Sequence, residues 1–381
     1  MTKELVILGA TGPIGAKAVR LAAAHPERFR IAGLVAGRRS AELAELSGLC
    51  GCEWAACLDA AELRRLAPPS CRVLDSPDDA IPEIIRPSVD TVLCAISGTS
   101  SLPAVLAAAK AGKALALATK EILVMAGDIL TRIIKHSGSR LLPVDSEHCA
   151  VFQCLQGRKR EDIRRIILTA SGGPFFRQPS LDLASVTPEQ ALAHPTWRMG
   201  PKITIDSATM MNKALEVIEA AWLFGVAPEQ IEVVIHPQSI VHSLIEFNDR
   251  TVIAQLAVPD MGLPILYCLD YPDHFPNDYP SLDLAAVGHL DFLSPDTRRF
   301  PGPELARQAL RLGGTAGAVL NAANEAAVER FCRRELRFDQ ISQAVAEALD
   351  AIDTANPDGE LAVVLEADRR AREFVKCWRN A

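Results

Sequence analysis

The sequence predicts an α/β protein of several domains: an N-terminal parallel sheet wrapped by helices, a central α+β unit and a helical C-terminal part. The chain has 381 residues, which is more than one hydrophobic core usually carries. Short apolar runs alternate with helical stretches over the first 145 residues, as is typical of a parallel sheet with helices on its faces. Hydrophobic residues make up 49% and charged residues 23%, which are globular values. A disordered chain, a fibrous protein and a single small binding module are excluded.

The N-terminal domain, residues 1–145, contains five apolar runs that we expect to be strands. The segments between them are amphipathic or rich in alanine, so we expect helices there. The five runs are 5–8, 31–35, 91–96, 114–118 and 141–144.

The remaining 236 residues change character twice, counting from 146 to 381. Residues 146–270 combine one strong helical pattern, 208–224, with four strand-like runs, 165–169, 231–235, 243–247 and 251–256. Residues 271–303 are rich in Pro, Asp and Gly, which is typical of a linker. Residues 304–381 carry Ala, Leu, Glu and Arg at helical spacing, which predicts a small helical domain.

Charge and hydropathy argue against several function classes. Lys and Arg number 40 against 47 Asp and Glu, for a net charge of −7, so no basic excess favours nucleic acid or an anionic membrane. The uncharged stretch 91–109 is interrupted by a Ser/Gly/Pro loop at 97–103, and the N-terminus lacks the basic segment and long apolar run of an export signal. Ten scattered cysteines lack zinc-finger spacing. We expect reduced thiols in a cytoplasmic protein.

A glycine-rich turn follows the first predicted strand. Gly9, Gly12 and Gly15 lie between the apolar run 5–8 and a helical stretch 16–24. Glycines let the backbone approach a pyrophosphate, and a helix N-terminus offers it free N–H groups. This arrangement predicts a Rossmann-type dinucleotide site, although a tight turn without a ligand has the same pattern. The cofactor-binding candidates here are Gly9, Thr11, Gly12, Pro13 and Ile14.

The end of the second predicted strand selects the cofactor. An NAD enzyme would place Asp or Glu there for the ribose hydroxyls, whereas this chain has Gly37, Arg38 and Arg39. Guanidinium groups favour a 2′-phosphate, so we expect NADPH. A solvated basic pair is the alternative.

Two carboxylates follow the strand predicted at 141–144. Asp145 and Glu147 are two residues apart, and on an extended backbone such residues point to the same side. Paired carboxylates suit Mg²⁺ or Mn²⁺. A loop facing solvent is the alternative.

The predicted helix 208–224 also carries polar groups near its start. Ser207 is placed to cap it, and Asn212, Glu216 and Glu219 lie on one face with Lys213 alongside. This pattern fits an anion site at a helix N-terminus, or simply an exposed polar face.

A second candidate phosphate site is the turn Ser171-Gly172-Gly173 after a predicted strand. Bare N–H groups and the Ser171 hydroxyl could hold a phosphate there, and an ordinary turn is the alternative.

Three histidines and one tryptophan are further candidates. His194, His236 and His242 lie near the polar segments, although a lone histidine is more often structural than catalytic. Trp197, between Pro195 and Gly200, could close over a bound substrate.

Together these segments resemble the 1-deoxy-D-xylulose 5-phosphate reductoisomerase family over essentially the whole chain. The motif SATMMNK at 207–213 is highly specific on its own. The ordered motifs are GATGPIG at 9–15, PVDSEH at 143–148, SGGPF at 171–175, HPTWRMG at 194–200, KITIDSATMMNKALEVIEA at 202–220, IHPQSIVHS at 235–243, PDM at 259–261 and LNAANE at 320–325.

The resemblance implies a reaction in two stages on the non-mevalonate isoprenoid route. The substrate skeleton rearranges by retro-aldol and aldol steps at one divalent metal, Mg²⁺ or Mn²⁺, and NADPH then reduces the resulting aldehyde to 2-C-methyl-D-erythritol 4-phosphate. It also implies a homodimer whose protomer has a nucleotide domain, a catalytic and dimerisation domain (146–270) and a helical C-terminal domain. Residues 193–201 would form a mobile flap.

The resemblance assigns site residues as well. The metal ligands would be Asp145, Glu147 and Glu216. The catalytic candidates are Glu147, Lys213, His194 and His242, and Thr119, Glu121 and Gly200 join the NADPH contacts. The substrate contacts would be Ser146, Ser171, His194, Trp197, Ser207, Asn212, Lys213 and Glu216.

The chain departs from the family pattern at a few positions. Thr119 and Ile122 flank Lys-Glu where the family usually has Asn and Ser or Thr, which alters a polar contact toward the nicotinamide. Cys149 replaces Asn or Ser, and Pro201 follows the flap.

Three alternative functions remain open at this stage. A plain NADPH dehydrogenase using Cys149 as nucleophile would leave the carboxylates unexplained. An NADPH-binding regulator without catalysis would have no use for a metal site. A divergent relative could act on another sugar phosphate.

Overall fold

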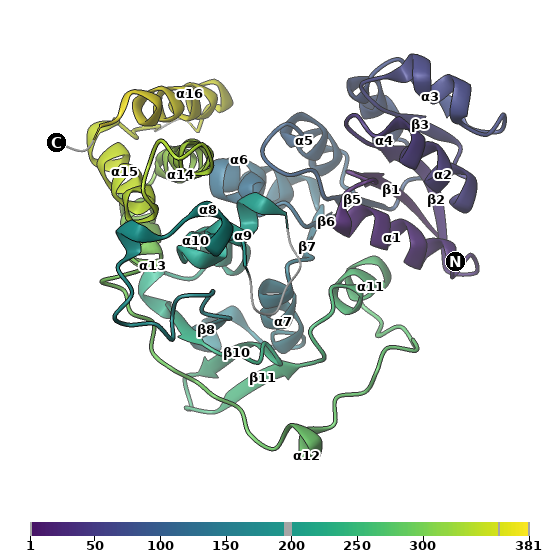
Figure 1. Cartoon of the computed structure of the whole chain (residues 1–381). Coiled ribbons are helices and arrows are strands. Elements are labelled where there is room, and N and C mark those ends of the chain that lie inside the picture. The colour runs from purple at the N-terminus through teal and green to yellow at the C-terminus, as the bar shows by residue number, and fades with distance from the viewer. Residues whose placement is uncertain (1, 194–199, 357–358, 380–381) are drawn as a thin grey trace. The chain divides into compact units, whose positions relative to one another are not determined.

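The computed structural model describes residues 2–193, 200–356 and 359–379. Residue contacts divide the chain into two compact units (Figure 1). Unit 1 comprises Met1–Ile122, Leu130–Phe152 and Asp260–Pro280, and unit 2 comprises Leu123–Ile129, Gln153–Pro259 and Ser281–Ala381. Neither unit is a continuous stretch of chain. The domain boundaries that we expect from the sequence alone stay a prediction.

Unit 1 is built on a parallel sheet of seven strands in the order β4-β3-β2-β1-β5-β6-β7. The order reverses at β1, which pairs with β2 on one side and β5 on the other. The five expected strands are confirmed, whereas β3 and β4 were not predicted. The strands are β1 (Lys3–Leu8), β2 (Phe29–Val35), β3 (Trp54–Ala56), β4 (Arg72–Val73), β5 (Thr91–Cys94), β6 (Ala114–Leu117) and β7 (Arg140–Pro143).

Helices connect these strands, as the alternating pattern predicts. Helix α6 (Lys120–Ser137) has a non-helical residue at Ala126, inside the stretch Leu123–Ile129 that belongs to unit 2. The other connecting helices are α1 (Pro13–Ala23), α2 (Ser40–Cys50), α3 (Ala60–Leu66), α4 (Ile81–Ile84) and α5 (Leu102–Lys110). Helix α7 (Ser146–Cys154) follows β7, and α11 (Gly262–Asp270) comes later in the chain.

A late segment completes the core of unit 1. Helix α11 packs against α1, and its residues Ile265 and Leu269 are fully buried. The Lys3 ammonium, at the start of β1, donates to the carbonyl oxygens of Leu269 (3.2 Å) and Tyr271 (3.0 Å). The first strand is therefore covered by residues that come about 260 positions later in the chain.

Unit 2 contains a mixed sheet of four strands in the order β11-β10-β8-β9. Strand β8 runs parallel to β9 and antiparallel to β10, which is antiparallel to β11. All four expected strands are confirmed. They are β8 (Ile163–Ala170), β9 (Ile231–Ile235), β10 (Val241–Phe247) and β11 (Val252–Leu256).

Apart from loops and short turns, the remaining described elements of unit 2 are helices, and the helical pattern predicted after residue 304 is confirmed. Figure 1 shows α14 packed with α15 and α16 near the C-terminus. None of the described helices is both long and apolar enough to span a membrane. The helices are α8 (Pro188–Ala191), α9 (Pro201–Ala208), α10 (Met211–Phe224), α12 (Leu284–Val287), α13 (Gly302–Leu312), α14 (Ala316–Cys332), α15 (Phe338–Ala351) and α16 (Leu361–Cys377).

The single helix predicted at 208–224 is wrong, because the chain turns between α9 and α10. Met210 has φ 62°, the left-handed conformation that helices do not continue through. Its carbonyl oxygen faces Gly302, where a β-carbon would come within 2.4 Å of it. Ser207 lies inside α9 and does not cap the following helix.

Candidate active-site residues

The glycine-rich turn of unit 1 has the geometry of a phosphate cradle. Gly9 has φ 86°, and a β-carbon on Gly15 would lie 2.1 Å from the Gly9 carbonyl oxygen. Gly12 donates its N–H to that same oxygen (2.9 Å) and caps α1 without a side chain. Pro13 begins the helix, Ile14 follows it, and Thr11 is buried in the turn. The exposed helix N-terminus fits a pyrophosphate.

Gly37, Arg38 and Arg39 follow β2 and are all exposed. The Arg39 guanidinium pairs with the Glu42 carboxylate at 2.9 Å. Exposed guanidinium groups are what a 2′-phosphate contact requires, and a solvated basic pair would look the same.

Thr119 and Ile122, which depart from the family pattern, have structural roles in the segment after β6. The buried Thr119 hydroxyl donates to the Ile96 carbonyl oxygen at 2.8 Å, so it ties the end of β6 to the residues after β5. Ile122 is fully buried. Glu121 is half-buried in the first turn of α6.

Asp145 lies between the end of β7 and the start of α7. The expected extended conformation of the Asp-x-Glu pair is wrong, because α7 begins at Ser146 and places Glu147 in its first turn. The helix starts there because the Asp145 carbonyl accepts the N–H of Cys149 at 2.8 Å. The Ser146 hydroxyl donates to Glu147 Oε2 at 2.6 Å.

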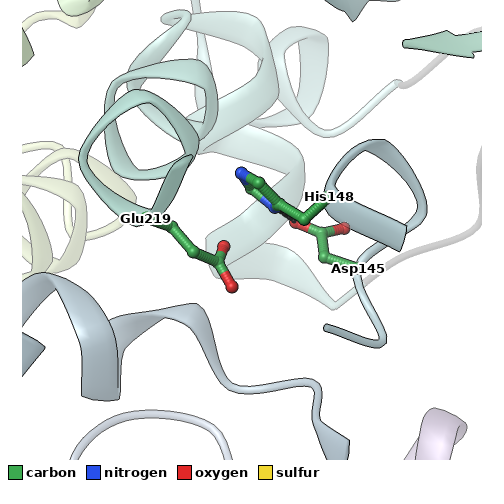
Figure 2. Close-up of side chains that lie close together, drawn as sticks. All are labelled: Asp145, His148 and Glu219. Atoms are coloured by element: carbon green, nitrogen blue, oxygen red, sulfur yellow. Dashed lines mark ion pairs between the residues drawn. The ribbon is translucent and has the colours of Figure 1, made fainter. Parts of the chain in front are cut away.

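Two cationic or titratable groups surround Asp145. Lys120 Nζ lies 2.5 Å from Asp145 Oδ2, and His148 Nδ1 lies 3.6 Å from the same oxygen. Figure 2 shows Asp145 and His148 together at the start of α7. Burial raises the pKa of Asp145, but the Lys120 ammonium and His148 outweigh it and hold the pKa well below its usual range. The lowered pKa favours the ionised carboxylate at neutral pH.

Lys120 and His148 were not among the residues predicted from the sequence. Lys120 follows β6 and Asp145 follows β7, and these strands are parallel neighbours. The carboxyl ends of neighbouring parallel strands meet at one edge of a sheet, so the strand pattern could have paired Lys120 with Asp145.

Unit 2 holds two buried acids on α10. Glu216 and Glu219 are each 1% exposed, and Figure 2 shows the Glu219 side chain projecting from this helix. Asn212 Nδ2 donates to Glu216 Oε1 at 2.5 Å, and the Lys213 ammonium pairs with Glu216 Oε2. The predicted spacing of Asn212 and Glu216 on one helix face is therefore confirmed.

The start of α10 is anchored to the strand that carries the candidate phosphate turn. Lys213 Nζ also donates to the Thr169 carbonyl oxygen near the end of β8, at 2.5 Å. The turn begins two residues later, at Ser171. Its glycines Gly172 and Gly173 have φ 89° and 67°. Successive backbone N–H groups in a turn can form an anion-binding concavity.

Ser207, in α9, lies beside the turn that contains Gly172 and Gly173. A β-carbon on Gly173 would lie 2.9 Å from the Ser207 carbonyl oxygen, so the turn and α9 touch. Gly173 donates its N–H to Ser171 Oγ at 3.4 Å. Four predicted substrate contacts, Ser171, Ser207, Asn212 and Lys213, thus come from elements that meet at one end of unit 2.

The histidines separate into different classes. His236 is structural, since it is fully buried, its Nδ1 lies 2.8 Å from the Asp291 carbonyl oxygen and its Nε2 accepts the N–H of Val241 at 3.1 Å. His242 is 7% exposed on β10. His194 and Trp197 fall outside the described residues. Gly200 is exposed and caps α9, whose first residue is Pro201, a favourable position for proline.

Cys149, the nucleophile of the dehydrogenase alternative, is 1% exposed inside α7. A nucleophilic thiol needs access to its substrate, so this burial disfavours that alternative.

Three family models match successive parts of the chain. The model described as 1-deoxy-D-xylulose 5-phosphate reductoisomerase matches residues 5–127. The model of the C-terminal domain of that enzyme matches residues 141–224, and one described as DXP reductoisomerase C-terminal domain matches residues 256–374.

Curated relatives and solved structures of the same name cover nearly the whole chain. The 1-deoxy-D-xylulose 5-phosphate reductoisomerase of Stutzerimonas stutzeri is 47% identical over 98% of this chain and 97% of its own length, and that of Moorella thermoacetica is 47% identical with the same coverage. The Zymomonas mobilis enzyme in complex with NADPH has a TM-score of 0.92 at 39% identity, covering 98% of both chains. A DOX-P reductoisomerase with NADPH, fosmidomycin and magnesium has a TM-score of 0.92 at 38% identity, covering 98% of this chain and 97% of that chain.

Proposed function

The chain belongs to the 1-deoxy-D-xylulose 5-phosphate reductoisomerase family, and we propose that it carries out that family's reaction. It would convert 1-deoxy-D-xylulose 5-phosphate to 2-C-methyl-D-erythritol 4-phosphate with NADPH and one divalent metal, a step toward isoprenoid precursors. The observation that carries the proposal is the retained set of acids, Asp145, Glu147 and Glu216, two of which are held beside buried lysines.

We propose that these three carboxylates bind Mg²⁺ or Mn²⁺. Their oxygen donors are of the kind that these ions prefer. The ammonium groups beside Asp145 and Glu216 support the assignment, since they indicate that both positions attract positive charge. The ion would polarise the ketone and hydroxyl oxygens of the substrate. Glu147, with the neighbouring Ser146 hydroxyl on its Oε2, could in addition exchange a proton with the substrate.

The turn from Gly9 to Ile14 would hold the pyrophosphate of NADPH. The close approach of Gly15 to the Gly9 carbonyl supports this role, because the turn is built from backbone alone. Arg38 and Arg39 would bind the 2′-phosphate, and Gly37, Thr119, Glu121 and Gly200 would complete the cofactor contacts. NADPH supplies the hydride.

The phosphate and carbon chain of the substrate would be held in unit 2. The Ser171 turn, Ser207 and the start of α10 support this role through their mutual contacts. Lys213 is 3% exposed, so its charge would act with little screening from water. Family resemblance alone adds Ser146, His194, His242 and Trp197, with 193–201 as the flap that excludes water.

The remaining assignments also follow from the family. The proposed domains are 1–145 for NADPH, 146–270 for catalysis and dimerisation, a linker at 271–303 and a helical domain at 304–381. We propose a homodimer in the cytoplasm, which light scattering of the purified protein and cell fractionation would test.

The first experiment measures NADPH oxidation by its absorbance, with 1-deoxy-D-xylulose 5-phosphate and Mn²⁺ present and then with the metal chelated. We expect turnover that chelation abolishes. NADPH binding without oxidation, in the presence of metal, would contradict the proposal and favour the regulator or another sugar phosphate.

Glu216→Gln tests the metal assignment in the same assay. Turnover should fall by at least about 10³-fold, with NADPH affinity unchanged because Glu216 is not among the proposed cofactor contacts. Glu229→Gln is the matched control, since Glu229 is an exposed acid just after the same helix. Equal activity of E216Q and E229Q would sink the assignment.

A further inference from the structure

Three cysteines gather in unit 1 where α2 ends and where β3 and β4 begin. Cys50 is the last residue of α2, and Cys52 and Cys71 come shortly before β3 and β4. These strands are parallel neighbours, with Trp54 opposite Arg72. The Sγ atoms of Cys52 and Cys71 are consequently only 3.8 Å apart.

This cluster lies away from the residues proposed for catalysis. Strands β3 and β4 form one edge of the sheet, while β7, which precedes Asp145, forms the other. The cysteines precede their strands, whereas Asp145 and Lys120 follow theirs. The proposed function therefore gives these thiols no role.

The three thiols differ in access and in acidity. Cys52 and Cys71 are 1% and 7% exposed, while Cys50 is half-buried. Gly51, at φ 62°, ends α2 and turns the chain between Cys50 and Cys52. A hydrogen bond from Cys52 lowers the pKa of Cys50, whereas the same contact raises the pKa of Cys52 to about 12. The accessible thiol is also the one that ionises most readily.

We propose that Cys52 and Cys71 form a reversible disulfide on exposure to peroxide, with Cys50 as the thiol that reacts with peroxide first. An S–S bond is about 2.05 Å long, so the two sulfurs must approach by about 1.8 Å. Strand β4 has two residues and pairs only with β3. We therefore place the required movement in this short edge strand.

The chemistry balances in three steps. The Cys50 thiolate attacks hydrogen peroxide, which breaks the O–O bond and leaves a sulfenic acid and hydroxide. The Cys52 thiol displaces the sulfenic oxygen as water and forms a Cys50–Cys52 disulfide. The Cys71 thiol, whose pKa is raised by its contact with Cys52 and by burial, then gives its proton to the hydroxide of the first step and attacks the Cys52 sulfur, which forms the Cys52–Cys71 bond and releases Cys50 as thiolate. In total, two thiols give two electrons to one peroxide, which becomes two waters.

The test is peptide mapping of the full-length protein. Cys332 and Cys377 are exposed, so the background variant carries C332S and C377S to remove their oxidation. The reduced protein is treated with hydrogen peroxide, alkylated, digested and analysed by mass spectrometry. We expect a Cys52–Cys71 linked peptide that a dithiol reductant removes.

Single variants in this background separate the roles. Cys50→Ser should slow formation of the linked peptide at least ten-fold, and Cys52→Ser should leave a sulfenic acid on Cys50 that a dimedone probe traps. Cys52→Ala replaces Cys52→Ser if the serine variant does not give the thermal unfolding curve of the parent. Oxidation of Cys50 to sulfinic acid with Cys52 and Cys71 still free, or an undiminished rate in C50S, would overturn the proposal. Because the readout is chemical, it stands whether or not the protein reduces its proposed substrate.

Discussion

Replacing Lys120 with Met removes the ammonium beside Asp145 and keeps most of the side-chain volume. Lys120 Nζ lies 2.5 Å from Asp145 Oδ2, and the two side chains are 6% and 16% exposed. The carboxylate would lose its strongest partner while it remains largely out of water. We expect the metal-free protein to be destabilised.

The size of the effect follows from the burial of the pair. Removing one partner of a fully buried ion pair costs about 3–5 kcal/mol. Asp145 keeps some exposure, and His148 Nδ1 stays 3.6 Å away, so we expect the low end, about 3 kcal/mol. For a unit of roughly 150–250 residues, 1 kcal/mol shifts Tm by about 2–4 °C. The expected fall in Tm is about 6–12 °C.

The pH dependence has a definite sign. Lys120 and His148 depress the folded-state pKa of Asp145, so the pair stabilises the protein above the unfolded-state pKa of about 3.9. That stability is lost as the pH falls. The Tm difference between K120M and the unchanged protein should therefore be largest near neutral pH and shrink in acid.

Thermal unfolding followed by circular dichroism, with a chelator and then with Mn²⁺, measures both effects. A cation bound to Asp145 would replace the lost charge, so Mn²⁺ should restore a large part of the Tm of K120M. Lys110→Met, at an exposed position at the end of α5, is the control. A K120M shift no larger than that of K110M would refute the ion-pair argument, and a loss that Mn²⁺ leaves unchanged would refute metal binding at Asp145.

Three further predictions concern unit 1. Gly15→Ala should weaken NADPH binding at least ten-fold in a fluorescence titration, because its β-carbon would meet the Gly9 carbonyl at 2.1 Å; unchanged affinity would mean that the turn is not the cradle. Arg38→Ala should raise the Kd for NADPH about 10–100-fold, roughly 1.4–2.8 kcal/mol, and leave the Kd for NADH unchanged. An equal loss of affinity for both cofactors would show that Arg38 does not bind the 2′-phosphate. Glu83→Gln should lower Tm slightly at pH 7 and not at pH 3, since the hydrogen bond from Arg72 lowers the pKa of Glu83 and the resulting stability disappears as the pH falls through that pKa; a constant difference would show that charge is not involved.

The regular parts of the fold could be predicted because buried strands and amphipathic helices leave clear patterns. Strands β3 and β4 could not, since they have three and two residues and no hydrophobic period is visible over so short a length. The turn at Met210 could not be predicted from the sequence either. A left-handed methionine has no sequence signal, and here close packing of Gly302 against its carbonyl accompanies it.

The sequence predicts which residue types form the site better than it predicts their backbone conformation. The Asp-x-Glu pattern does not reveal whether Glu147 is extended or helical, because the carbonyl of Asp145 decides this by accepting the N–H of Cys149. Lys120 was missed although its position after β6 could be read from the strand order. Its partner only becomes evident once β6 and β7 are known to be neighbours.

The late completion of the core of unit 1 has a consequence for the newly made chain on the ribosome. Strand β1 is synthesised first, but α11, which supplies the buried Ile265 and Leu269, is about 260 residues behind it. At about 5–20 residues per second, the growing chain waits roughly 13–50 s before this helix is made. During that interval the apolar face that α11 will cover is open to other chains and to chaperones. A nascent chain stalled before residue 260 should therefore be captured by chaperones far more readily than one stalled after residue 310.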